Sequence, residues 1–175
     1  MWCYIRRILS WLLLLGALTF LILGLTGKPA DAAIRQLEEA PGQVVYQARQ
    51  TLTDQQGHSW QAIGFKRIRP DGNTSFYLRL VGFPGTVTID RSQPLILSNS
   101  LGQTLTAADA SSQIFTEAGS PEPHVGQYDL QPILSQLRPE IPLRLTLATT
   151  NHTAVILQAP PTLVQEWQAL AGYES

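Results

Sequence analysis

Residues 44–90 read VVYQARQTLTDQQGHSWQAIGFKRIRPDGNTSFYLRLVGFPGTVTID, and this stretch decides the fold that we expect. Three short segments divide it, and each contains the Asp, Pro or Gly that a tight reversal of the chain requires. The runs between them are rich in β-branched and aromatic residues, which favour strands. The stretch therefore predicts four antiparallel strands that follow one another as a meander. The three reversals are Asp54–Gly57, Arg69–Gly72 and Phe83–Gly85.

The two faces of this sheet follow from the lengths of the turns, because successive side chains of a strand point to opposite faces. With four-residue turns at 54–57 and 69–72, Phe65 lies opposite both Tyr46 and Phe76. The core face then contains Tyr46, Ala48, Ile63, Phe65, Phe76, Leu78 and Leu80, and Val87 and Ile89 of the fourth strand extend it. The other face contains Arg49, Thr51, Trp60, Ala62, Gly64, Lys66, Tyr77 and Arg79.

This second, mixed face is the candidate binding surface, because arginine and aromatic side chains dominate protein interfaces. Ala62 and Gly64 leave a shallow place on it, where either a partner or a helix of the same domain approaches the sheet. The basic side chains near the end of the second hairpin suit an acidic partner or anionic lipid headgroups. The residues assigned to binding are Arg49, Trp60, Lys66, Arg67, Tyr77 and Arg79.

The chain after the meander predicts more strands and two or three helices. Alternating apolar residues predict a strand pair within 94–105 and a hairpin at 143–158. Apolar side chains with helical spacing predict helices at 130–137 and 162–171, and 106–113 resembles a capped short helix. The expected fold class is α+β, with one antiparallel meander sheet of about six strands and two or three helices packed on it.

The N-terminus has the pattern of an export signal. Two arginines precede an almost wholly apolar run at 8–26, and Ala30 and Ala32 satisfy the small-residue rule of signal peptidase, which would cut before Ala33. The apolar run is also near the lower length limit of a membrane-spanning helix, so an uncleaved anchor is the alternative. Both possibilities place the rest of the chain outside the cytoplasm.

The chain thus divides into a signal or anchor at 1–32, a lead-in at 33–42 and a single domain at 43–175. Without residues 1–32 it keeps nine Lys and Arg against twelve Asp and Glu, a net charge of −3. This charge is too small and of the wrong sign for a nucleic-acid-binding protein. The one cysteine, Cys3, lies in the N-terminal segment, which excludes disulfides and Cys-ligated zinc from the domain.

The sequence contains no motif for a catalytic residue, a cofactor or a metal. Gly-x-Ser-x-Gly, GxGxxG and the phosphate-binding loop are all missing. His58, His124 and His152 lie in predicted turns or loops and have no partner at metal-ligand spacing. His124, beside Glu122 in the Pro- and Gly-rich loop at 117–127, is the strongest of the three as a ligand or base. We expect neither an enzymatic activity nor a cofactor.

Three segments of the chain carry a resemblance to known proteins: VVYQARQTL at 44–52, DQQGHSWQA at 54–62 and LRLVGFPG at 78–85. Together they resemble a family of exported cyanobacterial proteins of unknown function, and the likeness extends over nearly all of the chain after the signal. The resemblance implies a compartment, the thylakoid lumen or the periplasm. It implies no reaction and no catalytic residues.

The sequence therefore favours a non-enzymatic binding or assembly module that contacts a membrane-associated protein from the lumen or the periplasm. If the N-terminal segment is not cleaved, residues 8–26 also hold the protein at the membrane. The first alternative is a carrier of a small ligand or lipid, with an apolar cavity between the sheet and the helices at 130–137 and 163–171. The second is a hydrolase that uses His124 or His152 with a nearby carboxylate.

Overall fold

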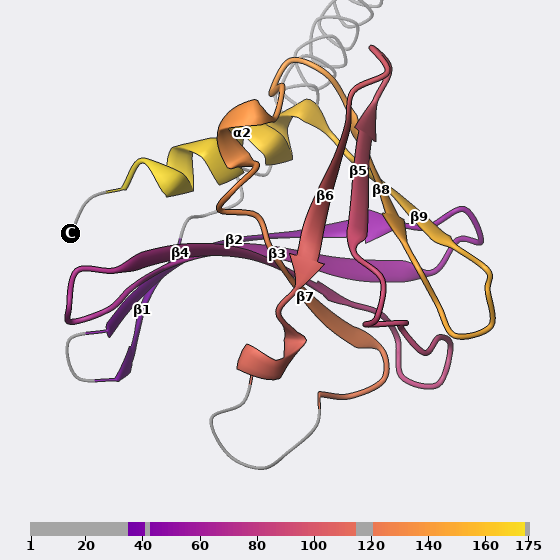
Figure 1. The fold of residues 1–175 in the computed structure, drawn as a ribbon, viewed down its shortest axis with the longest axis horizontal. Coiled ribbons are helices and arrows are strands. Elements are labelled where there is room, and N and C mark those ends of the chain that lie inside the picture. The colour runs from indigo at the N-terminus through magenta and orange to yellow at the C-terminus, as the bar shows by residue number, and fades with distance from the viewer. Residues whose placement is uncertain (1–34, 41–42, 115–120, 174–175) are drawn as a thin grey trace, which may run out of the picture. The chain divides into compact units, whose positions relative to one another are not determined.

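The computed structural model describes residues 35–40, 43–114 and 121–173. Within these residues, hydrogen bonds join nine strands into one sheet whose order is β1-β2-β3-β4-β7-β6-β5-β8-β9, and every neighbouring pair is antiparallel (Figure 1). The strands are β1 (Arg35–Ala40), β2 (Gln43–Thr53), β3 (Ser59–Ile68), β4 (Thr74–Val81), β5 (Leu95–Asn99), β6 (Thr104–Asp109), β7 (Val125–Asp129), β8 (Leu143–Leu147) and β9 (Val155–Ala159).

The sheet changes direction at β6, which belongs to two halves. Ala107 pairs with β5, whereas Ala108 pairs with β7. Strands β5, β8 and β9 therefore stand across the half formed by β1 to β4 and β7 (Figure 1). Strands β2 and β9, which are distant in the strand order, are in contact at one end. Asp54, just after β2, forms a β-bridge with Leu157 of β9, and the Gln55 side chain bonds two backbone groups at the start of β9. The core lies between the two halves.

The C-terminal helix α2 (Pro161–Ala171) packs on β2 and β3 and closes this core. Trp167 lies directly on Gly64 of β3, where an added Cβ would come within 2.5 Å of the indole. Glycine at position 64 thus allows the indole to lie directly against the strand, and the shallow place predicted there is filled by the domain's own helix. The helix predicted at 162–171 is confirmed, and its buried side chains are Leu163, Val164, Trp167 and Leu170.

The register predicted for the meander is wrong by one residue at each turn. The backbone N–H of Asp54 bonds the carbonyl of His58, so three residues, not four, separate the last bonded pair. Gly57 has φ of 87°, which is typical of a type I turn followed by a glycine bulge. The turn at 69–73 has the same hydrogen bonds, with Gly72 at φ of 79°. Each turn thus shifts the pairing by one position.

The two faces of β3 are exchanged relative to the prediction, whereas the faces of β2 and β4 are as predicted. The one-residue error at the β2–β3 turn misplaces β3, and the one-residue error at the β3–β4 turn restores the correct faces of β4. Trp60 and Lys66 therefore lie on the core side of the sheet, Lys66 at the C-terminus of α2 and Trp60 against Asp54. Phe65 lies on the opposite face, where it packs with Val45 and Tyr77 in a second, smaller apolar cluster. The core residues correctly predicted on β2 and β4 are Tyr46, Ala48, Phe76, Leu78 and Leu80.

The predicted fold class is wrong in its numbers of strands and helices. The described residues contain nine strands and one α-helix, against about six strands and two or three helices expected. The neighbour of β4 on its outer side is β7, not a fourth meander strand, and Ile89 forms only an isolated bridge with Thr149. The lead-in expected at 33–42 contains β1. The hairpins β5–β6 and β8–β9 agree with the prediction.

Two predicted helices are reduced to single 3₁₀ turns. Residues 104–109 form β6, followed by η1 (Ser111–Gln113), and the region 130–137 contains only η2 (Leu134–Gln136). A 3₁₀ turn also brings residues three apart to one side, so an apolar spacing of three and four does not require an α-helix. The apolar residues that suggested the second helix are nevertheless buried, namely Leu130, Ile133, Leu134 and Leu137.

The export signal predicted at 1–32, with its cleavage site at Ala30, Ala32 and Ala33 and its possible anchor at 8–26, lies outside the described residues. Among the residues that the structure does describe, no helix is both long enough and apolar enough to cross a membrane.

Candidate functional site

Four loops meet at one end of the sheet, which we call the loop end: residues 54–58, 82–90, 121–124 and 148–154. Backbone hydrogen bonds tie the last three together. The N–H of Gly82 bonds the His124 carbonyl at 3.0 Å, and that of Thr150 bonds the Thr88 carbonyl at 3.0 Å. The N–H groups of residues 89 and 90 bond the carbonyls of residues 123 and 148 at 2.9 and 3.0 Å. The Gln55 side chain joins the first loop to them through the Ala154 carbonyl at 2.7 Å, so the four loops are braced against one another.

An open cleft of about 430 Å³, the main cleft, lies between three of these loops. Its volume is within the range of about 300–1,000 Å³ that is usual for small-molecule sites. Pro84, Gly85 and Val87 form the apolar part of its wall, and Pro123 adds to it. The polar side chains that line it are Thr86, Thr88, Thr150, Asn151, Glu122 and His124.

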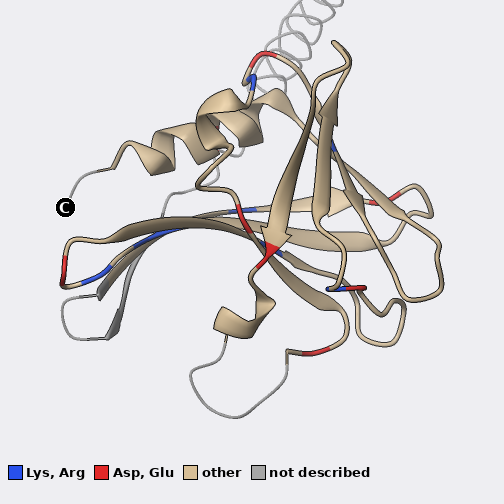
Figure 2. Cartoon of the chain, viewed as in Figure 1, with Lys and Arg blue, Asp and Glu red and all other residues tan. Residues whose placement is uncertain are grey.

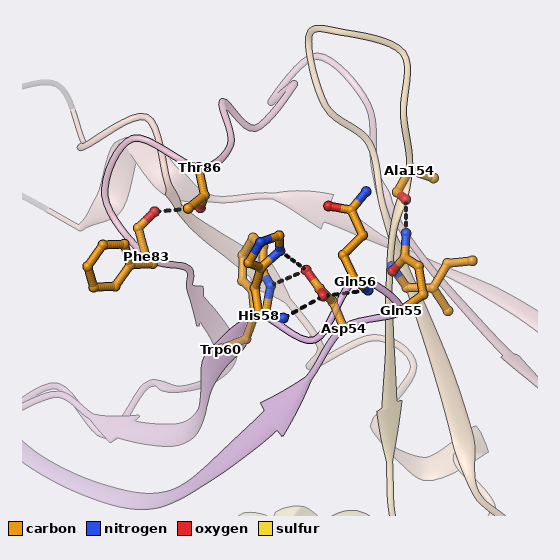
Figure 3. A network of polar contacts seen from close by, with 9 residues as sticks. Asp54, Gln55, Gln56, His58, Trp60, Phe83, Thr86 and Ala154 are labelled. Carbon is orange, nitrogen blue, oxygen red and sulfur yellow. Dashed lines mark hydrogen bonds and ion pairs between the residues drawn. The ribbon is translucent and has the colours of Figure 1, made fainter.

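A second pocket of about 40 Å³, the histidine pocket, adjoins the main cleft and shares Thr86, Val87 and Asn151 with it. Asp54 lies at its base, with a side chain only 3% exposed. The carboxylate of Asp54 accepts hydrogen bonds from the backbone N–H of Gln56 at 2.8 Å and of His58 at 2.9 Å. It also accepts one from the indole N–H of Trp60 at 3.1 Å and lies 3.2 Å from His58 Nδ1 (Figure 3).

These contacts fix the ionisation of Asp54. Burial acts to raise the pKa of Asp54, but the hydrogen bonds from His58, Trp60 and Gln56 together outweigh it and hold the pKa below its ordinary value. The ionised carboxylate orients the His58 ring through Nδ1, which leaves Nε2 for another partner. Such a pair is the base and its orienting group in many hydrolases. Among the described residues, however, no Ser, Thr or Cys side chain is hydrogen-bonded to His58.

Arg91 holds the turn that carries Glu122 and His124. Its guanidinium donates to three backbone carbonyls, those of Pro121 at 3.1 Å, Glu122 at 2.6 Å and Val125 at 2.8 Å. Hydrogen bonds from a charged donor are stronger than neutral ones, so this clamp fixes one wall of the main cleft. Nothing in the sequence pattern points to Arg91.

Phe83 stands beside the cleft on a turn of fixed geometry. Its side chain is 68% exposed. Its carbonyl accepts bonds from the backbone N–H of Thr86 at 3.3 Å and from the Thr86 hydroxyl at 2.7 Å, while Gly85 has φ of 80° (Figure 3). The turn therefore presents a large apolar ring to solvent without much freedom of the backbone that carries it.

With this geometry described, the chain can be compared with known proteins. Residues 32–170 match a family described as "Protein of unknown function (DUF3122)". The chain belongs to this family. The match agrees with the resemblance found in the sequence, in that no function is assigned to the family. No curated protein and no solved structure gives a significant match to the chain.

The structure separates the six residues that the sequence assigned to binding in this DUF3122 protein. Trp60 and Lys66 are buried on the core side of the sheet. Trp60 donates to Asp54. Lys66 Nζ donates to the carbonyls of Ala171 at 2.7 Å and Tyr173 at 2.6 Å, at the C-terminus of α2. Both side chains thus hold the fold together.

The other four, Arg49, Arg67, Tyr77 and Arg79, lie together on the outer face of the sheet. The guanidinium carbons of Arg67 and Arg79 lie 5.7 and 5.1 Å from the ring centroid of Phe65. The Tyr77 hydroxyl donates to Gln113 in η1 at 2.7 Å, so part of this face is already covered by the domain itself. Figure 2 shows the Lys and Arg positions of this half of the sheet in blue.

All three histidines lie in turns, as predicted. His58 and His124 line the two pockets of the loop end, and His152, with φ of 62°, lies in the β8–β9 turn at the same end. The pairing of His58 with Asp54 was not predicted. Its signal is an Asp and a His four residues apart across a glycine-bulge turn. The described residues contain no group of three or more His, Cys, Asp or Glu side chains placed to hold a metal.

Proposed function

We propose that this protein is a non-enzymatic binding module on the lumenal or periplasmic side of a membrane, where it contacts a membrane-associated protein. The export pattern at 1–32 and the resemblance to exported cyanobacterial proteins support the compartment. The braced loops support binding, because recognition sites are commonly loops held in place by a rigid scaffold. We assign the protein contact to the turn that carries Phe83.

The exposure of Phe83 is the observation that carries this assignment. Single exposed apolar residues are common on proteins, but this ring is 68% exposed and its turn is hydrogen-bonded on both sides. Burying a phenyl ring contributes about 1.5–3 kcal/mol. A turn that is already ordered loses little entropy on binding, so most of that free energy is retained in the complex.

The contacts in the histidine pocket give no support to the hydrolase alternative. The Asp54 carboxylate receives two backbone N–H groups of its own turn and the Trp60 indole, which are the contacts of a group that closes a turn. A hydrolase would need a nucleophile in hydrogen-bonding reach of His58. For the lipid carrier, neither the main cleft nor the histidine pocket is lined by residues of α2 or of the 130–137 region.

The test is capture of partners from native membranes with the tagged full chain, comparing wild type with Phe83→Ala and Leu101→Ala. Leu101 is the matched control, because it is also 68% exposed and lies in the β5–β6 turn, at the other end of β5 from the loop end. We expect Phe83→Ala to weaken capture of a membrane protein by about tenfold or more, and Leu101→Ala to leave it unchanged. Equal effects of the two variants would refute the assignment.

The same experiment with Arg49→Ala examines the outer face, since Arg49 is exposed there. The assignment to Phe83 requires that Arg49→Ala captures the same partner as wild type. If Arg49→Ala abolishes capture and Phe83→Ala does not, the contact surface is the outer face with Arg49, Arg67, Tyr77 and Arg79.

A further inference from the structure

We propose that the main cleft is a second binding site and that its ligand is a neutral, polyhydroxylated molecule, a saccharide. This site adjoins the protein contact proposed above, since Pro84, Gly85 and Thr86 of the turn that carries Phe83 line the cleft, whereas Phe83 itself does not. The inference follows from the hydrogen-bonding groups of the wall, from the charges around it and from its rigidity.

Three of the six polar residues in the wall of the main cleft are threonines. Thr86 comes from the turn after β4, and Thr88 and Thr150 come from two loops joined by a 3.0 Å backbone hydrogen bond. The Thr86 hydroxyl donates to the Phe83 carbonyl at 2.7 Å and that of Thr150 to the Thr88 carbonyl at 3.5 Å, so these two hydroxyls offer their lone pairs as acceptors for the hydroxyls of a sugar. The spacing of the three hydroxyls is set by the braced backbone, so they form a fixed pattern for a ligand with several hydroxyls of its own.

Asn151 adds a donor to this pattern. Its Oδ1 accepts a hydrogen bond from the backbone N–H of Thr153 at 3.0 Å, and the Thr149 hydroxyl, which lies 2.5 Å from both Oδ1 and the Thr153 carbonyl, has one proton to share between them. These bonds fix the orientation of the amide, so its two N–H groups remain as the donors that Asn151 can offer to a ligand in the cleft. An amide held in this way recognises hydroxyl oxygens without first losing side-chain freedom.

The charges at the loop end disfavour an anionic ligand. Among the residues that the structure describes, no Lys or Arg lines the main cleft, whereas Glu122 does. Asp54 is ionised at the base of the adjoining pocket, and Asp90 lies in the 82–90 loop. Arg91, the nearest cation in the sequence, is directed at three backbone carbonyls. A phosphate or a carboxylate entering the cleft would therefore be repelled.

The shape of the cleft disfavours a lipid chain. The cleft is open to water and its wall is rich in hydroxyl and amide groups, which an alkyl chain would desolvate without replacing their hydrogen bonds. Pro84 and Val87 provide a small apolar area, which suits the C–H face of a sugar ring. The volume of about 430 Å³ accommodates a small saccharide.

The experiment is saturation-transfer difference NMR on the full chain, in a zwitterionic detergent because alkyl glycosides would themselves occupy the site. The probes are D-glucose, N-acetyl-D-glucosamine and maltose, with inorganic phosphate and choline as charged comparators. We expect saturable binding of at least one saccharide and none of the comparators. Thr150→Val should weaken saccharide binding by roughly two- to tenfold, the worth of one hydrogen bond. Thr104→Val, an exposed threonine at the opposite end of the domain, should not change it.

Absence of binding by all three saccharides refutes the proposal, as does binding of phosphate or choline in their place. Equal effects of Thr150→Val and Thr104→Val refute the assignment to the main cleft. The measurement uses purified protein alone, so its result is independent of whether Phe83 captures a membrane partner.

Discussion

Gly64→Ala tests how closely α2 packs on the sheet. In the structure, a Cβ at position 64 would lie 2.5 Å from Trp167 Cδ1 and 2.6 Å from Trp167 Nε1. Ordinary contacts between carbon atoms are about 3.5–4.0 Å, so the indole must move by about 1 Å or more. Trp167 is fully buried, and overpacking of such a site costs about 1–3 kcal/mol. We expect Gly64→Ala to lower the free energy of unfolding by this amount.

The assay is urea unfolding of the full chain, followed by circular dichroism, in a double-mutant cycle with Trp167→Leu. Circular dichroism is preferred because the second substitution removes a fluorophore. If the indole causes the cost, Gly64→Ala should be neutral or slightly stabilising when residue 167 is leucine, with a coupling free energy of at least about 1–3 kcal/mol. Glycine in the interior of a strand is otherwise unfavourable by about 0.5–1 kcal/mol relative to alanine. A stabilised Gly64→Ala variant would therefore refute the packing argument.

Three further substitutions have clear expected outcomes. Lys66→Met removes the hydrogen bonds from the Lys66 ammonium group to the C-terminus of α2. We expect urea unfolding to show a free energy of unfolding lower by about 1.5–3 kcal/mol, and an unchanged value would refute the role of Lys66 in holding the helix. Hydrogen bonds to the Asp54 carboxylate outweigh its burial, so the pKa of Asp54 in the folded state is below the ordinary value of 3.8. The ionised carboxylate therefore stabilises the folded protein above pH 3.8, and this stabilisation is lost as the pH falls through the folded-state pKa. Thermal melts from pH 6 to pH 2 should thus fall more steeply below about pH 4 for wild type than for Asp54→Asn, and parallel curves would contradict this. Arg91→Ala should speed amide hydrogen exchange at residues 121–125, whereas Arg144→Ala, an exposed strand residue, should not; equal exchange in both variants would exclude the clamp.

Local patterns identified much of the fold from the sequence. The turn residues and β-branched runs located β2, β3 and β4, and the alternation of leucines located the β8–β9 hairpin. The last helix was also found, since its apolar spacing continues over three turns and ends at Gly172. These signals succeed because each depends on residues close together in the chain, whose backbone preferences act before any long-range contact.

The sequence predicted less of the candidate site than of the fold. All three histidines were placed in turns, but the position of His124 at the same end as the other two depends on β7, which inserts between β4 and β6. The same insertion brings Glu122 and His124 to the cleft, where Arg91 bonds the adjoining carbonyls. No periodicity in the sequence records a pairing between distant strands, so the main cleft could not be predicted.

By itself the sequence determined the export pattern, the cysteine-free domain and the run of strands from 43 to 81. Tertiary structure alone decided which face of β3 is buried, because one glycine bulge at each turn shifts the pairing by a residue and exchanges the two faces. It also decided that Trp60 and Lys66 hold the fold while Phe83 meets solvent. Burial is a property of the assembled sheet and helix, and local residue types specify it only when the register is known.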